Sequence, residues 1–553
     1  MPIELADVLR ALGAGVALTL ERQVLSPGRD RGGVVRPDWG IAEPTGTYGL
    51  LALCGMLYIA RENHPDMAPA EPDGPILLER MSLALEYLEA VQRPSGLIDL
   101  RDCNYDSSPD AGFAVQALCP VVELGRELLG RDPCWDGLLA GIEGFVRRLT
   151  VGMLDGGFHT PNHRWVMSAA MAWAGSLCPD MQVEPVIAAY LAEGFDADAD
   201  GAFIERSAGV YDAICDRSLL ILWERLRDRN ALQAARANLD LNLHMLHPDG
   251  TIETGASRRQ DYGTRPVPGG MALAYLMADR TEPDPRYRAA AELLWRRSRG
   301  DAAGLTAFLL SGRTTEVRLD SAFFPFDFRR LFPAVGMWRS RRGALSTTAF
   351  RSCTRLLTMV FGQAELSALK ISQSYFGTGR FVGDTLAETD GGCVLLSEGD
   401  VDVHRPGYDL PLGRPVDSQR WYENRGERDW RPLPRCRSEL AITEAMGGLD
   451  IVYRTLDGMP GVTAQMAFDF PPGGIWETGD TCLRPVAGQT IFLKAGHGAM
   501  RYGHDVIEIG PGADAHRMWA MRDAETAPGL VRILLTFETP VNHRLLIRCR
   551  REP

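Results

Sequence analysis

In the first three-fifths of the chain, apolar residues recur mostly at the spacing of an α-helix. Segments with broad apolar faces of this period lie at Ile76–Leu88, Val121–Leu129, Leu138–Leu149, Ser218–Leu226 and Ala289–Trp295. Apolar residues that return every three or four positions are typical of helices that pack on a core. The pattern therefore predicts a helical N-terminal half.

The connections between these helices share a loose repeat. A glycine, a short apolar stretch and a polar residue recur at Gly33, Gly96, Gly157, Gly201 and Gly250, as in Gly96-Leu97-Ile98-Asp99 and Gly250-Thr251-Ile252-Glu253. A period of roughly 45 to 60 residues fits one helical hairpin per repeat. Such hairpins pack either as an open solenoid or as a closed α/α toroid.

A cluster of groups that bind or ionise follows each of these glycines. Equivalent loops of a repeat array fall on one face, so we expect the clusters to converge, at one mouth of the ring if the array is a toroid. Their members include Arg36 and Trp39; Asp99, Arg101, Asp102, Asn104, Tyr105 and Asp106; Asn162, His163 and Arg164; Arg206, Tyr211, Asp212, Asp216 and Arg217; and Arg258, Arg259, Asp261, Tyr262 and Arg265.

From about Val335 onward the helical period gives way to short apolar runs of strand length. They include Thr358–Phe361, Leu366–Ile371, Cys393–Leu396, Leu440–Thr443, Leu449–Tyr453, Val462–Phe468, Gln489–Leu493, Val506–Ile509 and Val531–Phe537, with turn residues such as Gly391-Gly392 between them. Many short strands without intervening helices favour antiparallel sheets packed as a sandwich. We therefore predict an α+β protein with two domains, a helical toroid at residues 1–335 and an antiparallel β-sandwich at 336–553.

One long irregular excursion interrupts the strand-rich half, from Glu398 to Arg437, and carries His404. A loop of this length is either functional or disordered. Its aromatic and arginine content, as in Gln419-Arg420-Trp421-Tyr422, favours function.

Composition and charge limit the kinds of molecule that this protein is expected to bind. The 553 residues carry a formal net charge of −13, which makes nucleic acid or an anionic membrane an unfavourable partner. Among 59 basic residues only Lys370 and Lys494 are lysines, so the cations are planar arginine forks suited to carboxylates. The eleven cysteines and ten histidines show no metal-ligand spacing, and we expect no metal and no cofactor.

The acidic N-terminal segment does not resemble a signal peptide, so we expect a cytoplasmic protein.

The richest chemistry lies in the third cluster. Asn162, His163 and Arg164 stand consecutively at a predicted helix start, after Pro161 and before the apolar run Val166–Ala174. Backbone N–H groups at a helix start have no partners and favour an anion. A carboxamide, an imidazole and a guanidinium at this position suit a carboxylate ligand.

A helical toroid followed by antiparallel sheets, with Asn162-His163 opening a helix and Tyr211 about fifty residues later, resembles the heparinase II/III and alginate-lyase group of polysaccharide lyases. The segments Arg341–Ser346 and Tyr375–Phe381 resemble that group's entry into its sheet domain. The resemblance implies β-elimination at a uronic acid in an acidic polysaccharide or oligosaccharide.

The implied reaction needs donors aimed at the uronate carboxylate, a base near C5 and an acid near the leaving O4. Asn162 is the expected donor. His163 is the expected base, and Tyr211 either the acid alone or both base and acid, depending on the stereochemistry of the uronate. The resemblance makes His404 a second catalytic histidine. Candidates for substrate binding are Trp39, Asp102, Tyr105, Arg164, Arg217, Arg258, Arg259 and Tyr262.

Two other functions fit the sequence. A glycoside hydrolase on the same toroid, similar to the unsaturated glucuronyl hydrolases, would use paired carboxylates, for which Asp102, Asp106 and Asp110 are candidates. A non-catalytic glycan-binding protein would use the loops only to hold sugars. The spacing of Asn162-His163 and Tyr211 and the large sheet domain favour the lyase.

Overall fold

A computed structural model describes residues 2–130, 132–318, 324, 326–375, 378–399, 407–432, 435–521 and 524–553. The chain divides into a helical unit, Met1–Leu246 with Gly250–Phe324, and a sheet unit, His247–Asp249 with Pro325–Pro553. Strand β7 (Phe328–Phe332) already pairs with β8 (Met337–Arg342). The division thus lies earlier than the expected position at residue 335, because β7 already belongs to the first sheet.

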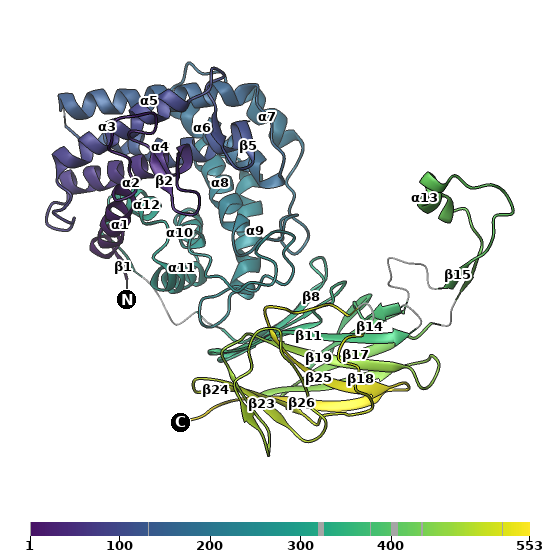
Figure 1. Ribbon diagram of the computed structural model, residues 1–553. Helices are drawn as coiled ribbons and strands as arrows, with labels where there is room; N and C mark the ends of the chain where they lie inside the picture. Colours follow the sequence, from purple (N-terminus) through teal and green to yellow (C-terminus); the bar gives the residue numbers. More distant parts are fainter. Residues whose placement is uncertain are drawn as a thin grey trace. The chain divides into compact units, whose positions relative to one another are not determined.

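Among its described residues the helical unit contains twelve helices (Figure 1), and all five segments with helical periodicity are helical. The helices are α1 (Leu5–Leu20), α2 (Pro44–Asn63), α3 (Gly74–Val91), α4 (Ser108–Leu128), α5 (Pro133–Leu154), α6 (Pro161–Leu177), α7 (Glu184–Ala192), α8 (Tyr211–Leu226), α9 (Arg229–Met245), α10 (Met271–Thr281), α11 (Pro285–Ser298) and α12 (Ala302–Ser311). None of the helices in this described part of the chain is long and apolar enough to cross a membrane.

The even-numbered helices form a closed inner ring. Each packs against the next, from α2 through α4, α6, α8 and α10 to α12, and α12 packs back on α2 and α4. The odd-numbered helices lie outside them, each packed on a helix of the inner ring. Since the last inner helix meets the first, the repeat builds a closed α/α toroid and not an open solenoid.

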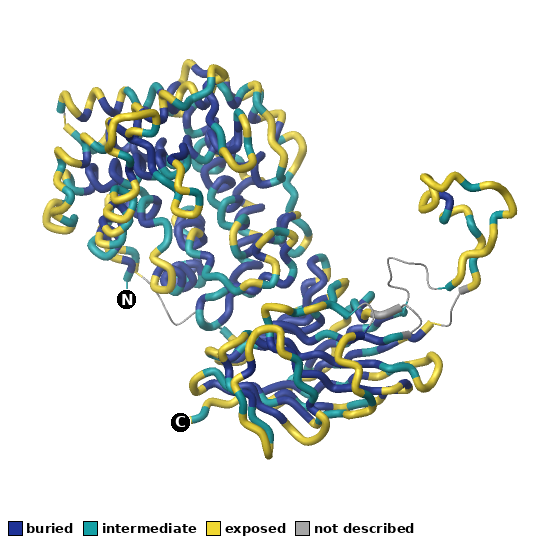
Figure 2. Tube along the Cα trace, viewed as in Figure 1, coloured by how far each residue is buried: buried dark blue, intermediate teal, exposed yellow. Residues whose placement is uncertain are grey.

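Burial distinguishes the two rings. Residues Asn162 to Ala172 of α6 are buried without a break, whereas the outer helices have exposed residues, such as Gln233 and Ala237 in α9 and Arg296 and Arg297 in α11 (Figure 2). A helix that is buried all round needs small or apolar side chains on every face, and a helix on the outside needs them on one face only. The polar groups that α6 does carry are therefore unusual for its position.

The repeated glycines are explained by close packing on the outer helices. Gly96 and Gly201 have φ angles of 93° and 92°, a region that side chains other than glycine rarely adopt. A Cβ atom would lie 2.3 Å from the carbonyl oxygen of Arg148 at the first and 2.4 Å from that of Ala237 at the second. Gly157 has no such neighbour, so its loop departs from the repeat.

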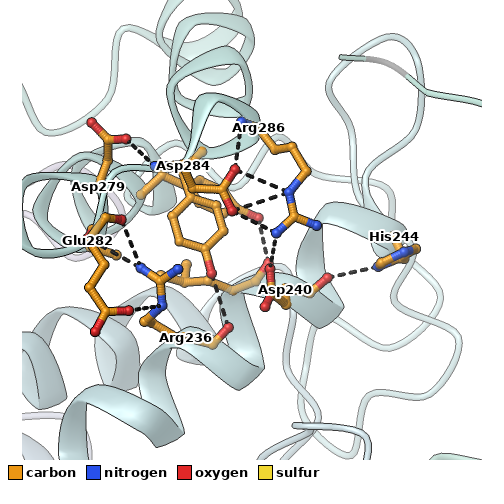
Figure 3. Close-up of polar contacts among 11 residues, drawn as sticks. Arg236, Asp240, His244, Asp279, Glu282, Asp284 and Arg286 are labelled. Carbon is orange, nitrogen blue, oxygen red and sulfur yellow. Dashed lines mark hydrogen bonds and ion pairs between the residues drawn. The ribbon is translucent and has the colours of Figure 1, made fainter. Parts of the chain in front are cut away.

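A polar cluster fixes the hairpin between α10 and α11 against α9 (Figure 3). The Arg286 guanidinium donates to the Asp284 carboxylate and lies 3.1 Å from Asp240, while Arg236 Nε lies 3.3 Å from Glu282. Asp284 also begins α11 by accepting from the backbone N–H of Arg286. Burial raises the pKa of Asp284, but the hydrogen bonds from Arg286 outweigh it, and the net pKa is lowered.

Replacing Arg286 with alanine is expected to lower the free energy of unfolding by about 1–2 kcal/mol, because the buried Asp284 carboxylate loses its partner. The lowered pKa of Asp284 gives stability that is present above about pH 3.9 and is lost as the pH falls below it. The difference between wild type and variant in urea unfolding should therefore shrink in acid. The exposed pair of Arg10 with Asp7 supplies a control, Arg10→Ala, for which we expect little change. An equal loss in the two variants would contradict this account.

The sheet unit consists of two sheets of nine strands each among the described residues. The first runs β22 (Thr490–Phe492), β25 (Val531–Glu538), β19 (Thr463–Phe470), β11 (Ala364–Tyr375), β10 (Leu357–Phe361), β9 (Leu345–Phe350), β8 and β7, with β12 (Thr378–Arg380) beside β11. The second runs β13 (Thr385–Thr389), β14 (Gly392–Ser397), β17 (Ser438–Ala445), β18 (Gly448–Thr455), β26 (Asn542–Arg551), β24 (Asp505–Gly510), β23 (Gly498–Tyr502), β20 (Ile475–Glu477) and β21 (Cys482–Leu483). All pairs are antiparallel except β22 with β25, and every predicted strand is present.

The two sheets share one apolar core, which makes the unit a sandwich. Leu369 and Phe468 of the first sheet and Leu440, Ile451 and Ile547 of the second are buried together. Along β18 buried and less buried positions alternate, as expected for a strand with one face on the core. The predicted antiparallel β-sandwich is confirmed.

Shorter elements complete the chain. The two-stranded pairs are β1 (Ile3–Glu4) with β6 (Glu316–Val317), β2 (Val34–Arg36) with β3 (Ile41–Glu43), β4 (Ile98–Leu100) with β5 (Asn104–Ser107), and β15 (Gly407–Asp409) with β16 (Trp430–Pro432). The last pair and the short helix α13 (Trp421–Arg425) lie within the excursion that was expected to be irregular. His404 lies outside the described residues.

Candidate active site

The site is built on the first turn of α6, and the local sequence fixes how that turn begins. Pro161 occupies the first helical position, where its missing N–H is not needed. Thr160, the residue before it, makes no side-chain bond to the helix backbone. Its hydroxyl instead lies 2.6 Å from Oδ1 of Asn162 and donates to it. This contact orients the Asn162 amide.

The Asn162 amide presents a donor with no partner. The residue is 1% exposed, and its Nδ2 makes no hydrogen bond to the part of the chain that the structure describes. A buried donor left unpaired costs roughly 1–3 kcal/mol, and most buried polar groups in proteins are paired. An unpaired amide in this position is suited to an acceptor that belongs to a ligand.

His163 is buried beside it between two aromatic rings. The ring centroids of Phe113 and His159 lie 6.3 Å and 4.8 Å from that of His163, both edge to face. Burial, and then the positive potentials of His159 and Arg259, lower the pKa of His163 to about 4. The imidazole is therefore neutral at neutral pH and can both accept and donate a proton.

We expect the lowered pKa of His163 to make the stability of the folded protein depend on pH. A histidine whose folded pKa is below its unfolded value of about 6.5 contributes stability that is complete above that pH and is lost as the pH falls toward the folded value. The gap in melting temperature between wild type and His163→Gln should therefore narrow from pH 7 to pH 4. An NMR titration of the His163 ring, assigned with the same variant, gives the pKa directly. A midpoint between 6 and 7 would refute the predicted neutral, buried ring.

Arg164 faces a different direction. Its guanidinium lies 3.0 Å from a Glu193 oxygen and 3.4 Å from Asp196, over the ring of Trp165. These partners follow α7, and Trp165 also donates to Asp196. These contacts brace the start of α6, and the substrate contact expected of Arg164 from the sequence stays a prediction.

Tyr211 is the first residue of α8, and its hydroxyl is held by two donors from the fifth loop. Nη2 of Arg259 lies 3.3 Å and Nε2 of Gln260 lies 3.0 Å from the phenolic oxygen. The Arg259 guanidinium also lies over the Tyr211 ring, 4.7 Å from its centroid. These contacts fix the position of the Tyr211 hydroxyl.

Glu205 links Asn162 to the pair formed by Arg259 and Tyr211. Its carboxylate lies 3.2 Å from Nη1 of Arg259, and the backbone N–H of Asn162 is close enough to lower the pKa of that carboxylate. Burial raises the pKa of Glu205, and Arg259 and the Asn162 N–H oppose that effect. Asn162, Glu205, Arg259 and Tyr211 therefore form one continuous chain of contacts.

Asp261 fixes the position of Tyr211. This buried carboxylate accepts from the hydroxyls of Ser207 and Ser257 and, at 3.0 Å, from the N–H of Gly209. The Ser207 hydroxyl in turn accepts from the backbone N–H of Tyr211. The fourth and fifth loops are thus joined immediately before α8.

A cleft of about 570 Å³ opens beside His163. Its lining comes from the second and third loops and includes Asn104, Tyr105, Asp106, Asp155 and His159. Since the His159 ring contacts that of His163, the cleft adjoins the site. The first loop joins the second through a hydrogen bond of 3.0 Å from Arg101 to the carbonyl of Ala42. Successive loops are thus in contact, as expected from the repeat.

Most of the other predicted binding residues lie on these loops. Trp39 is stacked under Arg36, Tyr105 is 76% exposed with Arg93 over its ring, and Arg258 donates to the carbonyl of Ile204. Asp102 is exposed, and Tyr262 is 45% exposed. None of these contacts involves Asn162 or Tyr211, so their roles stay predictions.

Arg217, another predicted binding residue, does not lie on these loops. It lies 3.4 Å from Asp301 and lines a separate cavity of about 300 Å³, formed by residues such as Glu123, Trp173 and Arg225. Those residues belong to the later turns of the inner helices, whereas the site lies at their first turns.

The carboxylates expected for a hydrolase have structural partners. Asp110 is buried and accepts from Asn104 and Ser107 near the start of α4. Asp106 accepts from the hydroxyl of Ser95. No contact singles out a pair of these carboxylates as acid and base.

Glu205, Gln260, His159 and the bracing Asp261 were not predicted from the sequence as site residues. A signal existed for Glu205, because an acidic residue ends the Gly201 connection just as Asp99 and Glu253 end theirs. No pattern distinguishes Gln260 or His159 from ordinary loop residues.

No protein-family model matches the chain, and no curated protein matches its sequence. Solved structures do match. A xanthan lyase from Paenibacillus superposes over 99% of this chain at a TM-score of 0.56 with 10% identity, and the chain spans 57% of that lyase. A heparinase III superposes over 99% of the chain and 84% of its own length (TM-score 0.50, 10% identity). A chondroitinase AC lyase superposes over 98% and 81% (TM-score 0.50, 12% identity). The chain therefore has the fold of these polysaccharide lyases, a helical toroid followed by an antiparallel β-sandwich.

Proposed function

We propose that this protein is a lyase that cleaves a uronic-acid-containing polysaccharide or oligosaccharide by β-elimination. The observation that carries the proposal is the unpaired, buried Nδ2 of Asn162, in a residue whose backbone N–H lies beside Glu205, which in turn pairs with Arg259 at the hydroxyl of Tyr211. The fold supports it, since the similar structures are a xanthan lyase, a heparinase III and a chondroitinase AC lyase.

Asn162 meets the first requirement of the reaction. Removal of the proton at C5 places additional negative charge on the neighbouring carboxylate, and a donor aimed at that group lowers the barrier. The free Nδ2 supplies such a donor without a charge of its own. Thr160 holds it in place from the other side of the amide, so little reorganisation is needed during the reaction.

Tyr211 meets the second requirement. Arg259 and Gln260 hold its hydroxyl in a fixed position, and in the proposed reaction this oxygen takes the proton from C5. The same oxygen then returns a proton to O4 as the C4–O4 bond breaks and the double bond forms between C4 and C5. The proton removed from carbon is balanced by the one given to oxygen, and no water is consumed.

His163 is a weaker base than Tyr211 in this arrangement. A group with a pKa of about 4 has little tendency to take a proton from carbon at neutral pH. We assign His163 to hydrogen bonding with the uronate as a neutral ring. It also shields the site from water together with Phe113.

Incubation with a panel of uronate polymers and oligosaccharides tests the proposal. The ultraviolet absorbance of a 4,5-unsaturated uronate should rise with at least one of them. New reducing ends without absorbance would indicate hydrolysis, and neither signal on a broad panel would favour glycan binding alone. The Tyr211→Phe variant, purified identically, excludes a contaminating lyase.

A further inference from the structure

We propose that the cleft beside His159 receives an uncharged, unsulfated sugar next to the uronate, so that the enzyme selects glycans in which uronates alternate with neutral sugars. This inference rests on the proposed function and specifies the substrate class of the same site. The residues that carry it are Asp106, Asp155, Tyr105 and His159, all of which line the cleft.

The cleft has the size and position of a sugar subsite. Its volume of about 570 Å³ lies within the range of small-molecule sites, roughly 300–1,000 Å³. It begins at His159, whose ring centroid is 4.8 Å from that of His163. A uronate at Asn162 therefore places a neighbouring sugar of the same chain in the cleft.

The charge of the lining excludes an anionic sugar. Neither lysine nor arginine is among the lining residues, and two of them, Asp106 and Asp155, are carboxylates. The Arg93 guanidinium, which lies over the ring of the lining residue Tyr105, is paired with Asp99. A sulfate or carboxylate in the cleft would face two like charges with only His159 as a possible cation.

Two hydrogen bonds fix Asp106 in place at the cleft. Its φ angle of 50° is uncommon for a residue other than glycine. The backbone N–H of Asp106 donates to Asp99 at 2.8 Å, and the hydroxyl of Ser95 donates to its side chain. Local strain of this kind persists where surrounding contacts fix it and is often found at binding sites.

The same lining suits a neutral sugar. Carboxylates accept hydrogen bonds from sugar hydroxyls, and the exposed ring of Tyr105 offers a flat apolar face. Arg259, whose positive charge lowers the pKa of His163, belongs to the part of the site proposed to hold the uronate. The site thus separates a cationic position for the uronate from an acidic position for its neighbour.

Pairs of glycans with the same backbone test the inference. Unsulfated chondroitin is compared with chondroitin 4-sulfate and 6-sulfate, and heparosan with heparan sulfate, by the rate of unsaturated product. We expect kcat/KM to be at least about tenfold higher for the unsulfated member of any pair that is cleaved, because the two carboxylates of the cleft repel a sulfate.

The Asp106→Asn, Asp155→Asn double variant should lower the ratio of kcat/KM for the unsulfated glycan to that for the sulfated glycan at least threefold. Asn tolerates the φ of position 106, so the backbone is kept. The exposed Asp180, paired with Arg147, gives the control Asp180→Asn, whose ratio should equal that of wild type.

Binding separates this inference from the proposed function. Calorimetry with the Tyr211→Phe variant and size-matched oligosaccharides of each pair should show tighter binding of the unsulfated member. Equal rates and equal affinities within each pair would overturn the selectivity and leave β-elimination intact. Selective binding without unsaturated product from any glycan would overturn the proposed reaction and leave the selectivity intact.

Discussion

Replacement of Tyr211 by phenylalanine is expected to lower kcat by about 10²- to 10⁴-fold, the usual contribution of a positioned acid or base. The hydroxyl is the only part removed, and the ring can still pack under Arg259, so KM should change little. The measurement is the initial rate of unsaturated product on a substrate that the wild type cleaves.

The matched control for this change is Tyr287→Phe. That tyrosine donates to the carbonyl of Arg236 at 3.2 Å, in outer helix α11. We expect its loss to affect stability and to leave the rate near that of wild type. A Tyr211→Phe enzyme that keeps more than a tenth of the wild-type kcat would remove Tyr211 from the mechanism.

Replacement of Asn162 by alanine is expected to lower kcat/KM by about 10²- to 10³-fold, as for the loss of one donor to a developing anion. Replacement by aspartate should be more damaging, because its carboxylate would repel that of the uronate. Since Nδ2 makes no hydrogen bond to the residues that the structure describes, Asn162→Ala gives up one side-chain hydrogen bond, that from Thr160, and should cost little stability. Loss of activity at an almost unchanged melting temperature is therefore the expected signature.

A structural role for Asn162 predicts the opposite combination, with stability lost together with activity. The control is Asn63→Ala at the end of α2, where the amide donates to the carbonyl of Ile59. It should lose a little stability and no activity. Wild-type rates in Asn162→Ala would contradict the assignment of the amide to the uronate carboxylate.

Much of the fold could be predicted because both halves have clear periods. The helical period and the recurring glycines define a ring of hairpins, and the short apolar runs define the sandwich. The helical period alone left closure of the ring open, because a solenoid has the same local pattern. The resemblance to the lyases indicated a toroid, and the packing of α12 on α2 confirms it. The exact domain boundary also depends on strand pairing, which β7 makes with residues after 335.

The sequence identified Asn162, His163 and Tyr211 as candidate catalytic residues, and the structure places all three at the starts of neighbouring inner helices. Two of the expected binding residues, Arg164 and Arg217, have partners away from Asn162 and Tyr211, which the sequence pattern did not indicate. Arg164 pairs with Glu193 and Asp196, which follow α7. Arg217 is six residues beyond Tyr211 along α8, roughly 9 Å further along the helix axis, and lies in another cavity.

The link between the two catalytic groups was the least predictable part. Glu205 and Arg259 lie on different loops, and only the folded ring brings the carboxylate to the backbone of Asn162 and the guanidinium to Tyr211. A chain of contacts between loops so far apart in sequence leaves no local pattern.

The central claim, that Asn162 and Tyr211 perform an elimination, is tested most directly by the masses of the products. A defined uronate oligosaccharide is cleaved by the wild type, with Tyr211→Phe as the blank, and both fragments are weighed by mass spectrometry. The account predicts that the fragment masses add up to that of the substrate, with a 4,5-unsaturated uronate at one new end. Fragments whose summed mass exceeds that of the substrate by one water would show hydrolysis and contradict it.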